Sequence, residues 1–224
     1  MKTFPPHLEI LPLPQKLLWE ELYATPEHFT LYGGTALALH LGHRKSVDFD
    51  FFSREPFQAE DLMSFIPYLE GAERMDVAKN NLTCRVDREG AVKMQFFGGL
   101  SLGNIEPRQQ PVGGGFWVAS LIDVAGTKIK VLPERSEAKD YLDVDALLRH
   151  GVDLPTMLGA AKAIYGRSFN PVLSLKAVTY FADVSRLPDD VKGRLTDAAI
   201  NVDLGKLPTF KPVQPPVFVN GNVP

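Results

Sequence analysis

The chain of 224 residues has a single cysteine, no surplus of basic residues and no long apolar run. One cysteine, Cys84, excludes an internal disulfide and a metal site of several thiolates, and it suits a reducing compartment. The net charge of −3 argues against a protein that coats nucleic acid nonspecifically. No segment approaches the roughly 18 apolar residues of a membrane span, and the start lacks a signal-peptide core. We therefore expect a cytoplasmic protein.

The composition is that of a globular protein, with 45% hydrophobic and 23% charged residues. The first 120 residues alternate between strand-like and helix-like patterns, and the remainder is helical. We expect strands at 29–32, 46–52, 82–86, 91–97 and 116–119, and helices at 15–24, 35–41, 58–69, 121–130, 138–149, 155–165, 171–182 and 189–200. Cys84, Trp19 and Trp117 are expected in the core.

The pattern predicts an α+β fold, a mixed sheet with flanking helices followed by a helical C-terminal half. We expect an α/β domain over 1–120, a helical domain over 121–204 and a proline-rich extended tail over 205–224.

Two short motifs stand close together in the α/β half. Gly33 and Gly34 lie where a strand turns into a helix, a place where backbone N–H groups favour phosphate. Asp48 and Asp50 alternate with apolar residues on the next strand, so both carboxylates share one face and suit a divalent cation. Alone, each motif is more often a plain turn or a solvated strand face. Their combination within 20 residues indicates metal-assisted chemistry at phosphorus.

The run from Gly33 to Phe52 resembles the signature of the AbiEii-type toxin nucleotidyltransferases, members of the minimal, DNA-polymerase-beta-like nucleotidyltransferase superfamily. A later stretch resembles the family's helical motif. It comprises Asp123, Lys128, Arg135, Lys139, Asp140 and Asp143. The resemblance covers about residues 28–150, with both motifs in the family's order. It implies the nucleotidyltransferase fold for the mixed sheet.

The resemblance also implies roles. Asp48 and Asp50 would bind Mg²⁺, in a site with room for two ions, and act in catalysis together with Lys128, which would reach the nucleotide phosphates with Asp123 behind it. The implied nucleotide-binding residues are Gly33, Gly34, Thr35, Arg44, Ser46, Lys139 and Asp140. The implied reaction moves a nucleoside monophosphate from a nucleoside triphosphate to a hydroxyl on RNA or protein. Family members are toxins of two-gene systems, which implies a cognate antitoxin as partner.

One departure from the superfamily pattern concerns a third carboxylate, which active members usually carry on a following strand. The matching segment, 92–97, has no acid on either face, whether Lys93 and Gln95 or the residues between them point to the site. Asp87 and Asp143 are the alternatives for this role. The departure leaves three hypotheses open: an active nucleotidyltransferase, a nucleotide-binding member that acts through a partner without catalysis, and a phosphotransferase on the same fold.

Overall fold

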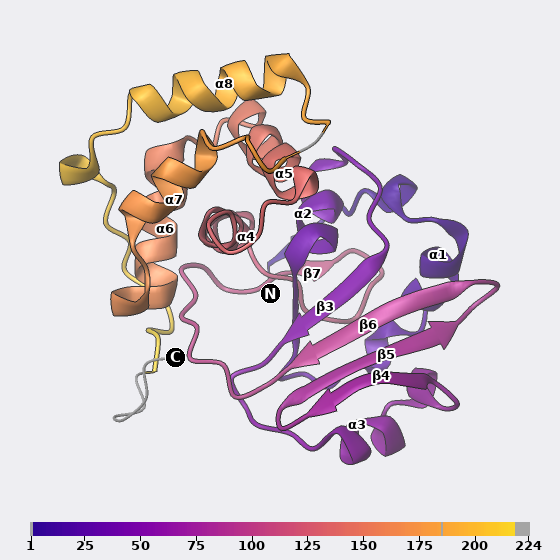
Figure 1. The fold of residues 1–224 in the computed structure, drawn as a ribbon. Coiled ribbons are helices and arrows are strands. Elements are labelled where there is room, and N and C mark those ends of the chain that lie inside the picture. The colour runs from indigo at the N-terminus through magenta and orange to yellow at the C-terminus, as the bar shows by residue number, and fades with distance from the viewer. Residues whose placement is uncertain (1, 185, 218–224) are drawn as a thin grey trace. The chain divides into compact units, whose positions relative to one another are not determined.

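The computed structural model describes residues 2–184 and 186–217, and these divide into two compact units (Figure 1). The first unit contains the described residues up to Leu100 together with Pro107–Ser120. The second contains Ser101–Glu106 and the described residues from Leu121 onward, including the described part of the tail. Whether each unit folds as a domain on its own stays a prediction.

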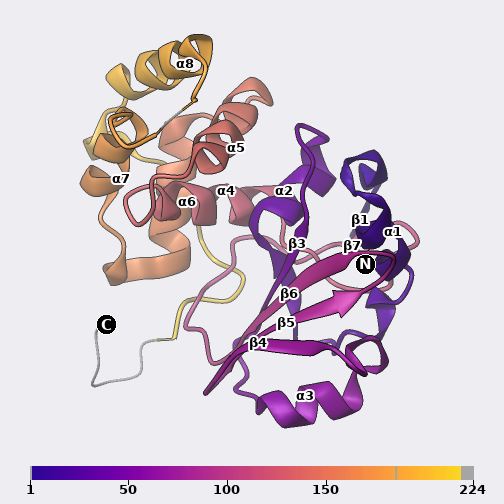
Figure 2. The same ribbon diagram turned by 45° about the vertical axis from the view of Figure 1, so that its right-hand side comes forward.

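The first unit is built on a mixed sheet of five strands in the order β2-β3-β6-β5-β4. These strands are β2 (Thr30–Tyr32), β3 (Asp48–Phe52), β4 (Glu73–Ala78), β5 (Asn81–Asp87) and β6 (Ala91–Phe97). Strands β3 and β6 are parallel and the other neighbours are antiparallel, as Figures 1 and 2 allow the reader to follow. The described residues of the unit also form a small parallel pair and three α-helices: β1 (Thr3–Phe4) with β7 (Gln110–Pro111), α1 (Leu13–Trp19), α2 (Gly33–Leu41) and α3 (Ala59–Phe65). The predicted α+β fold with a mixed sheet is confirmed.

One face of this sheet forms the core of the unit. Phe51 stacks on Phe96 with ring centroids 5.4 Å apart, and Phe29 packs edge-on against Phe96 at 5.2 Å. Strict alternation along each strand places the neighbouring residues on the opposite face. We call it the Asp48 face; it carries Tyr32, Asp48, Asp50, Phe52, Thr83, Arg85, Asp87, Lys93, Gln95 and Phe97. Most of these residues keep partial or full solvent exposure, so the sheet is packed on one side and polar on the other.

Several local predictions differ from the structure. Strand β4 was not predicted, because all six of its residues are exposed and its sequence lacks apolar alternation. The segment 116–119 is not a strand, since only Val118 forms isolated bridges there. The helix predicted over 15–24 ends at Trp19. Trp19 is buried as predicted, whereas Trp117 keeps partial exposure and is not a core residue.

The second unit is helical, as the sequence predicts. Its helices are α4 (Leu121–Val131), α5 (Ala138–Arg149), α6 (Leu154–Tyr165), α7 (Pro171–Val178) and α8 (Asp189–Ile200). The carboxylate of Asp153 accepts the N–H of Thr156 at 2.8 Å and caps α6. Asn170 caps α7 in the same way and Pro171 follows at the first helical position, so the predicted start of this helix is confirmed.

The segment 101–106 and the tail run beside each other within the second unit. Asn104 donates its N–H to the carbonyl of Gln214 at 2.9 Å and accepts the N–H of Val213 at 2.9 Å. Phe210 packs against the buried residues Ile105, Ala160 and Ile164. The described part of the proline-rich tail is thus tied to the segment 101–106. Residues 218–224 of the predicted tail lie outside the described residues.

No helix among the described residues is long and apolar enough to cross a membrane.

Candidate functional site

The start of α2 brings a helix N-terminus against the carboxylate of Asp50. Gly33 is the first residue of the helix and has a φ of +73°, a conformation that side chains other than glycine rarely adopt. A Cβ atom built at Gly33 would collide with Oδ2 of Asp50, and one built at Gly34 would collide with Nη2 of Arg44. Gly33 is therefore required by its backbone conformation and by the close approach of Asp50, whereas at Gly34 the neighbouring atom is the end of a flexible arginine side chain.

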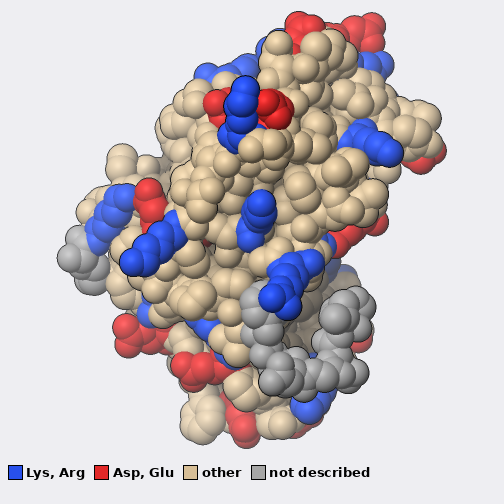
Figure 3. Space-filling view, turned by 90° about the vertical axis from the view of Figure 1, so that its left-hand side faces the viewer, with Lys and Arg blue, Asp and Glu red and all other residues tan. Residues whose placement is uncertain are grey.

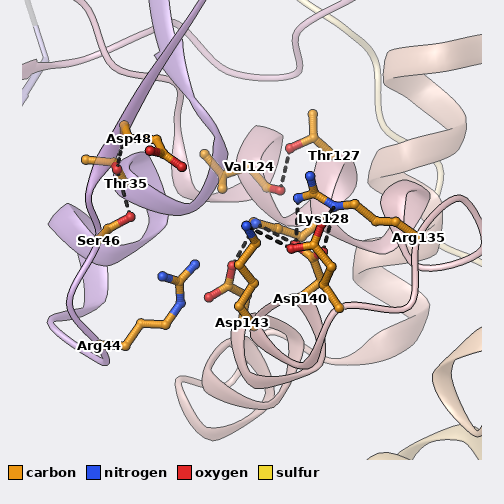
Figure 4. Close-up of polar contacts among 12 residues, drawn as sticks. Thr35, Arg44, Ser46, Asp48, Val124, Thr127, Lys128, Arg135, Asp140 and Asp143 are labelled. Atoms are coloured by element: carbon orange, nitrogen blue, oxygen red, sulfur yellow. Dashed lines mark hydrogen bonds and ion pairs between the residues drawn. The ribbon is translucent and has the colours of Figure 1, made fainter. Parts of the chain in front are cut away.

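Thr35 and Ser46 hold this turn to β3. The hydroxyl of Thr35 lies 2.8 Å from that of Ser46 and also hydrogen-bonds the main-chain carbonyl of Asp48 (Figure 4). Thr35 is 1% exposed and Ser46 6%. These two hydroxyls fix the helix start relative to the strand that carries the carboxylates.

Asp48 and Asp50 lie on one face of β3, both partly exposed. Their partners in the parallel pairing with β6 are Lys93 and Gln95. Two carboxylates beside a helix N-terminus fit a magnesium ion, which prefers one or two carboxylates plus phosphate and water oxygens. The carbonyl oxygen of Gln95 is a neutral donor next to them.

The register settles which residues of β6 face the acids. Val92 and Met94 are fully buried, so Lys93 and Gln95 share the Asp48 face. Asp87 lies on β5, two strands from β3 and one row beyond Lys93. Strand spacings of about 4.8 Å and about 3.4 Å per residue put it roughly 12 Å from Asp48, too far to share a cation. Asp87 is therefore excluded as the third acid, and no group of three or more potential metal ligands occurs among the described His, Cys, Asp and Glu residues.

The later motif forms a buried ion cluster within the second unit (Figure 4). The ammonium nitrogen of Lys128, on α4, lies 3.1 Å from Oδ1 of Asp140 and 2.6 Å from Oδ2 of Asp143. The two aspartates are one helical turn apart on α5, so they face the same way. Their side chains are fully buried, and that of Lys128 is 5% exposed. The structure thus brings these three predicted residues together.

Arg135 completes the charge balance of this cluster. Its guanidinium forks onto the carboxylate of Asp140 with bonds of 2.8 Å and 3.1 Å. Two cations therefore meet two anions. Lys139, in contrast, pairs with Glu137 at 2.8 Å, and this hydrogen bond lowers the pKa of Glu137. The structure does not bring Lys139 into the cluster.

Asp123 has a structural contact that the sequence did not reveal. Its carboxylate is 1% exposed and accepts the N–H groups of Ile105 at 2.6 Å and Glu106 at 3.2 Å. Because both donors lie in the segment 101–106, Asp123 ties that segment to the first turn of α4. No local sequence pattern marks a main-chain contact between residues so far apart.

A mixed sheet with a glycine turn at one strand and two carboxylates on the next defines a protein of the nucleotidyltransferase fold. Two solved structures share this fold. MenT4, a nucleotidyltransferase toxin from Mycobacterium tuberculosis H37Rv, superposes with a TM-score of 0.57 at 16% identity over 85% of this chain and 83% of its own. A candidate nucleotidyltransferase from H. pylori superposes with a TM-score of 0.51 at 18% identity, over 87% of this chain and 92% of its own.

The sequence comparison is more specific. The family model described as nucleotidyl transferase AbiEii toxin of type IV toxin–antitoxin systems matches residues 16–211. The chain belongs to this family. The uncharacterized protein aq_aa25 of Aquifex aeolicus (strain VF5) is 31% identical over 158 residues, which is 69% of this chain and 74% of that protein.

Proposed function

We propose that the protein transfers a nucleoside monophosphate from a nucleoside triphosphate to a hydroxyl on RNA or protein, with pyrophosphate leaving, and that it acts as the toxin of a two-gene system with a cognate antitoxin. The observation that carries the proposal is the placement of Asp50 against the first residue of α2, with Asp48 on the same strand face. This arrangement supports a cation held by the two carboxylates next to a polyphosphate held by main-chain N–H groups.

Several of the predicted residues have a chemical part in this proposal. The main-chain N–H groups at Gly33 and Gly34 and the guanidinium of Arg44 bind phosphate oxygens. Asp48 and Asp50 hold magnesium, which when bound would neutralise charge that develops on the phosphates. The family resemblance also assigns a role in catalysis to Lys128, in the second unit. Its buried neighbours Asp140 and Asp143 fix the position of its ammonium group.

The chemistry of Gln95 supports a second candidate, nucleotide binding without transfer. Gln95 is the direct neighbour of Asp50 on β6, where an acid would help deprotonate the attacking hydroxyl. A neutral amide cannot act as a base. If no other group takes up the proton, the protein binds a nucleotide and acts through its partner.

The deciding experiment is incubation of the protein with each α-³²P-labelled nucleoside triphosphate and Mg²⁺. The acceptor is either total RNA or a protein lysate from the native host. The proposal expects label on one acceptor with the wild type and none with Asp48→Asn. Asp87→Asn is the matched control, because it removes a carboxylate from the same sheet face roughly 12 Å away.

Three outcomes separate the candidates. Label from the α-position on an acceptor supports the transferase. Label only from a γ-³²P nucleotide identifies a phosphotransferase. Binding of a nucleotide in calorimetry with no label transferred from either position supports the binding-only candidate. Localisation in the cytoplasm stays part of the proposal, tested by fractionation of the native host.

A further inference from the structure

A row of aromatic side chains crosses the Asp48 face next to the carboxylates. Phe52 follows Asp50 by two residues on the same strand, so the two side chains share a face and their positions along the strand are about 7 Å apart. The ring of Tyr32 stacks on Phe52 with centroids 5.0 Å apart and planes 17° from parallel. Phe97, opposite Phe52 on β6, meets it edge-on at 5.5 Å.

Trp117 and Arg108 extend this row beyond β2. Val118 is buried and bridges to Leu31, so Trp117 projects to the other side, the side of Tyr32. The guanidinium carbon of Arg108 lies 4.5 Å from the centre of the Trp117 ring. Arg108 also reaches Oγ1 of Thr30, the residue that pairs with Phe52. A cation and an aromatic ring thus occupy the end of the row.

The positions of Phe52, Phe97 and Trp117 are not explained by core packing. The core of the unit lies on the opposite face, where Phe51 and Phe96 are fully buried. Phe52, Phe97 and Trp117 keep partial exposure. Aromatic rings on a polar sheet face, with an arginine beside them, are a common means of binding single-stranded nucleic acid, because every base can stack on a ring.

We propose that Phe52, Phe97 and Trp117 form a base-stacking surface for the end of a single-stranded RNA acceptor, with the buried ring of Tyr32 packed against Phe52 and with Arg108 contacting the phosphodiester backbone. This inference rests on the proposed function and chooses RNA over protein as the acceptor. The row from Trp117 to Phe97 spans three inter-strand spacings, about 14 Å, which is longer than one nucleobase and suits a short strand. The ring nearest to the carboxylates is that of Phe52, two residues from Asp50 on the same strand, so the end of the RNA strand would reach the carboxylates.

The test measures binding of a short fluorescein-labelled single-stranded RNA by anisotropy, without nucleoside triphosphate. Phe97→Leu and Trp117→Leu are each expected to weaken binding about tenfold. Phe65→Leu is the matched control, because Phe65 is 77% exposed on α3, away from the Asp48 face, and its loss is expected to change nothing. Thermal melting followed by circular dichroism shows whether each variant folds. Trp117→Leu leaves the Phe52–Phe97 contact intact, so it still tests the inference if Phe97→Leu unfolds the protein.

Two further measurements are needed. One shows whether the rings stack on bases of RNA or on the base of the nucleoside triphosphate, and the other separates failure of this inference from failure of the proposed function. Calorimetry with a non-hydrolysable nucleoside triphosphate is expected to give the same affinity for all variants; a parallel loss would assign the rings to the nucleotide base and overturn the inference. Unchanged RNA affinity in both folded variants would overturn it too, as would a wild type that labels protein and does not bind RNA. Ring-dependent RNA binding that persists in Asp48→Asn, with no label transfer by the wild type, would defeat only the proposed function.

Discussion

Two pairs of aspartates, one in each unit, differ in their surroundings. Asp48 and Asp50 are two residues apart on a strand and remain partly exposed. Asp140 and Asp143 are three residues apart on a helix, have fully buried side chains, and both contact Lys128. Spacing along each element brings the carboxylates of either pair to one face.

The difference shows how burial decides the use of a carboxylate pair. A buried charge is stable only with a counter-charge and hydrogen bonds, so Asp140 and Asp143 need their lysine at all times. A partly exposed pair stays hydrated and can exchange water for a cation. We therefore assign stability to the helical pair and ligand binding to the strand pair, an assignment that the following changes test.

The largest effect is expected from the strand pair. Asp48→Asn keeps the shape of the side chain and removes one charge from the proposed metal site, so transfer should fall about a thousandfold, equivalent to about 4 kcal/mol of barrier. The initial rate of label transfer measures this. Its melting temperature should stay near that of the wild type, and retention of full activity would contradict the assignment.

The next effect is expected on stability. Lys128→Met leaves Asp140 and Asp143 buried without their shared ammonium, and the free energy of unfolding should drop by about 3–5 kcal/mol. Urea denaturation measures this loss. Lys139→Met, which breaks only the half-exposed pair with Glu137, should cost under about 1 kcal/mol. Equal losses in the two variants would refute the distinction between buried and exposed pairs.

The glycine turn offers a matched comparison of two substitutions. Gly33 and Gly71 have nearly the same φ, +73° and +71°, but only at Gly33 would a Cβ atom meet another group, the carboxylate of Asp50. Gly71→Ala should therefore cost about 1 kcal/mol of stability from backbone strain alone. Gly33→Ala should cost more and weaken binding of a nucleoside triphosphate, measured by calorimetry. Equal stability and nucleotide affinity in the two variants would show that the side chain of Asp50 can move away from residue 33 without loss of binding.

The smallest effect concerns alkaline pH and the core of the sheet unit. Burial raises the pKa of the Cys84 thiol to about 11. The unfolded thiol releases its proton near its ordinary pKa of about 8.5, so the unfolded chain binds fewer protons above that pH and stability declines toward pH 11. Cys84→Ala should flatten this part of the stability profile in urea titrations at several pH values. An unchanged slope would assign the decline to other groups.

The sequence predicted the parts of the fold that local pattern controls. The hairpin of β5 and β6, the strand of the aspartates and helices such as α5 follow from alternation, helical periodicity and caps, and they occur close to where they were expected. Edge strand β4 was missed because its exposed residues carry no apolar pattern. Short pairings such as β1 with β7 depend on contacts distant in sequence and leave no local signal.

The candidate site shows the same division. The grouping of Gly33 with Asp50 followed from motifs that the chain carries. The contacts of Lys128 with Asp140 and Asp143 did not, because the resemblance implied a role for Lys128 at the nucleotide phosphates. The role of Asp123 in holding the segment 101–106 and the partial exposure of Trp117 did not follow, because each depends on how a long connection returns to the sheet or to a helix. A pattern identifies residue types, whereas the register of the sheet decides their neighbours.

The tie between Asp123 and the segment 101–106 has a practical consequence for dissecting the chain. The backbone passes from one unit to the other at three places, after residues 100, 106 and 120. A fragment that begins at Leu121 would lack the two N–H donors that Asp123 accepts and the strand partner of Gln214. Neither half can be cut out or exchanged at a single junction, so hybrids between relatives need paired crossovers.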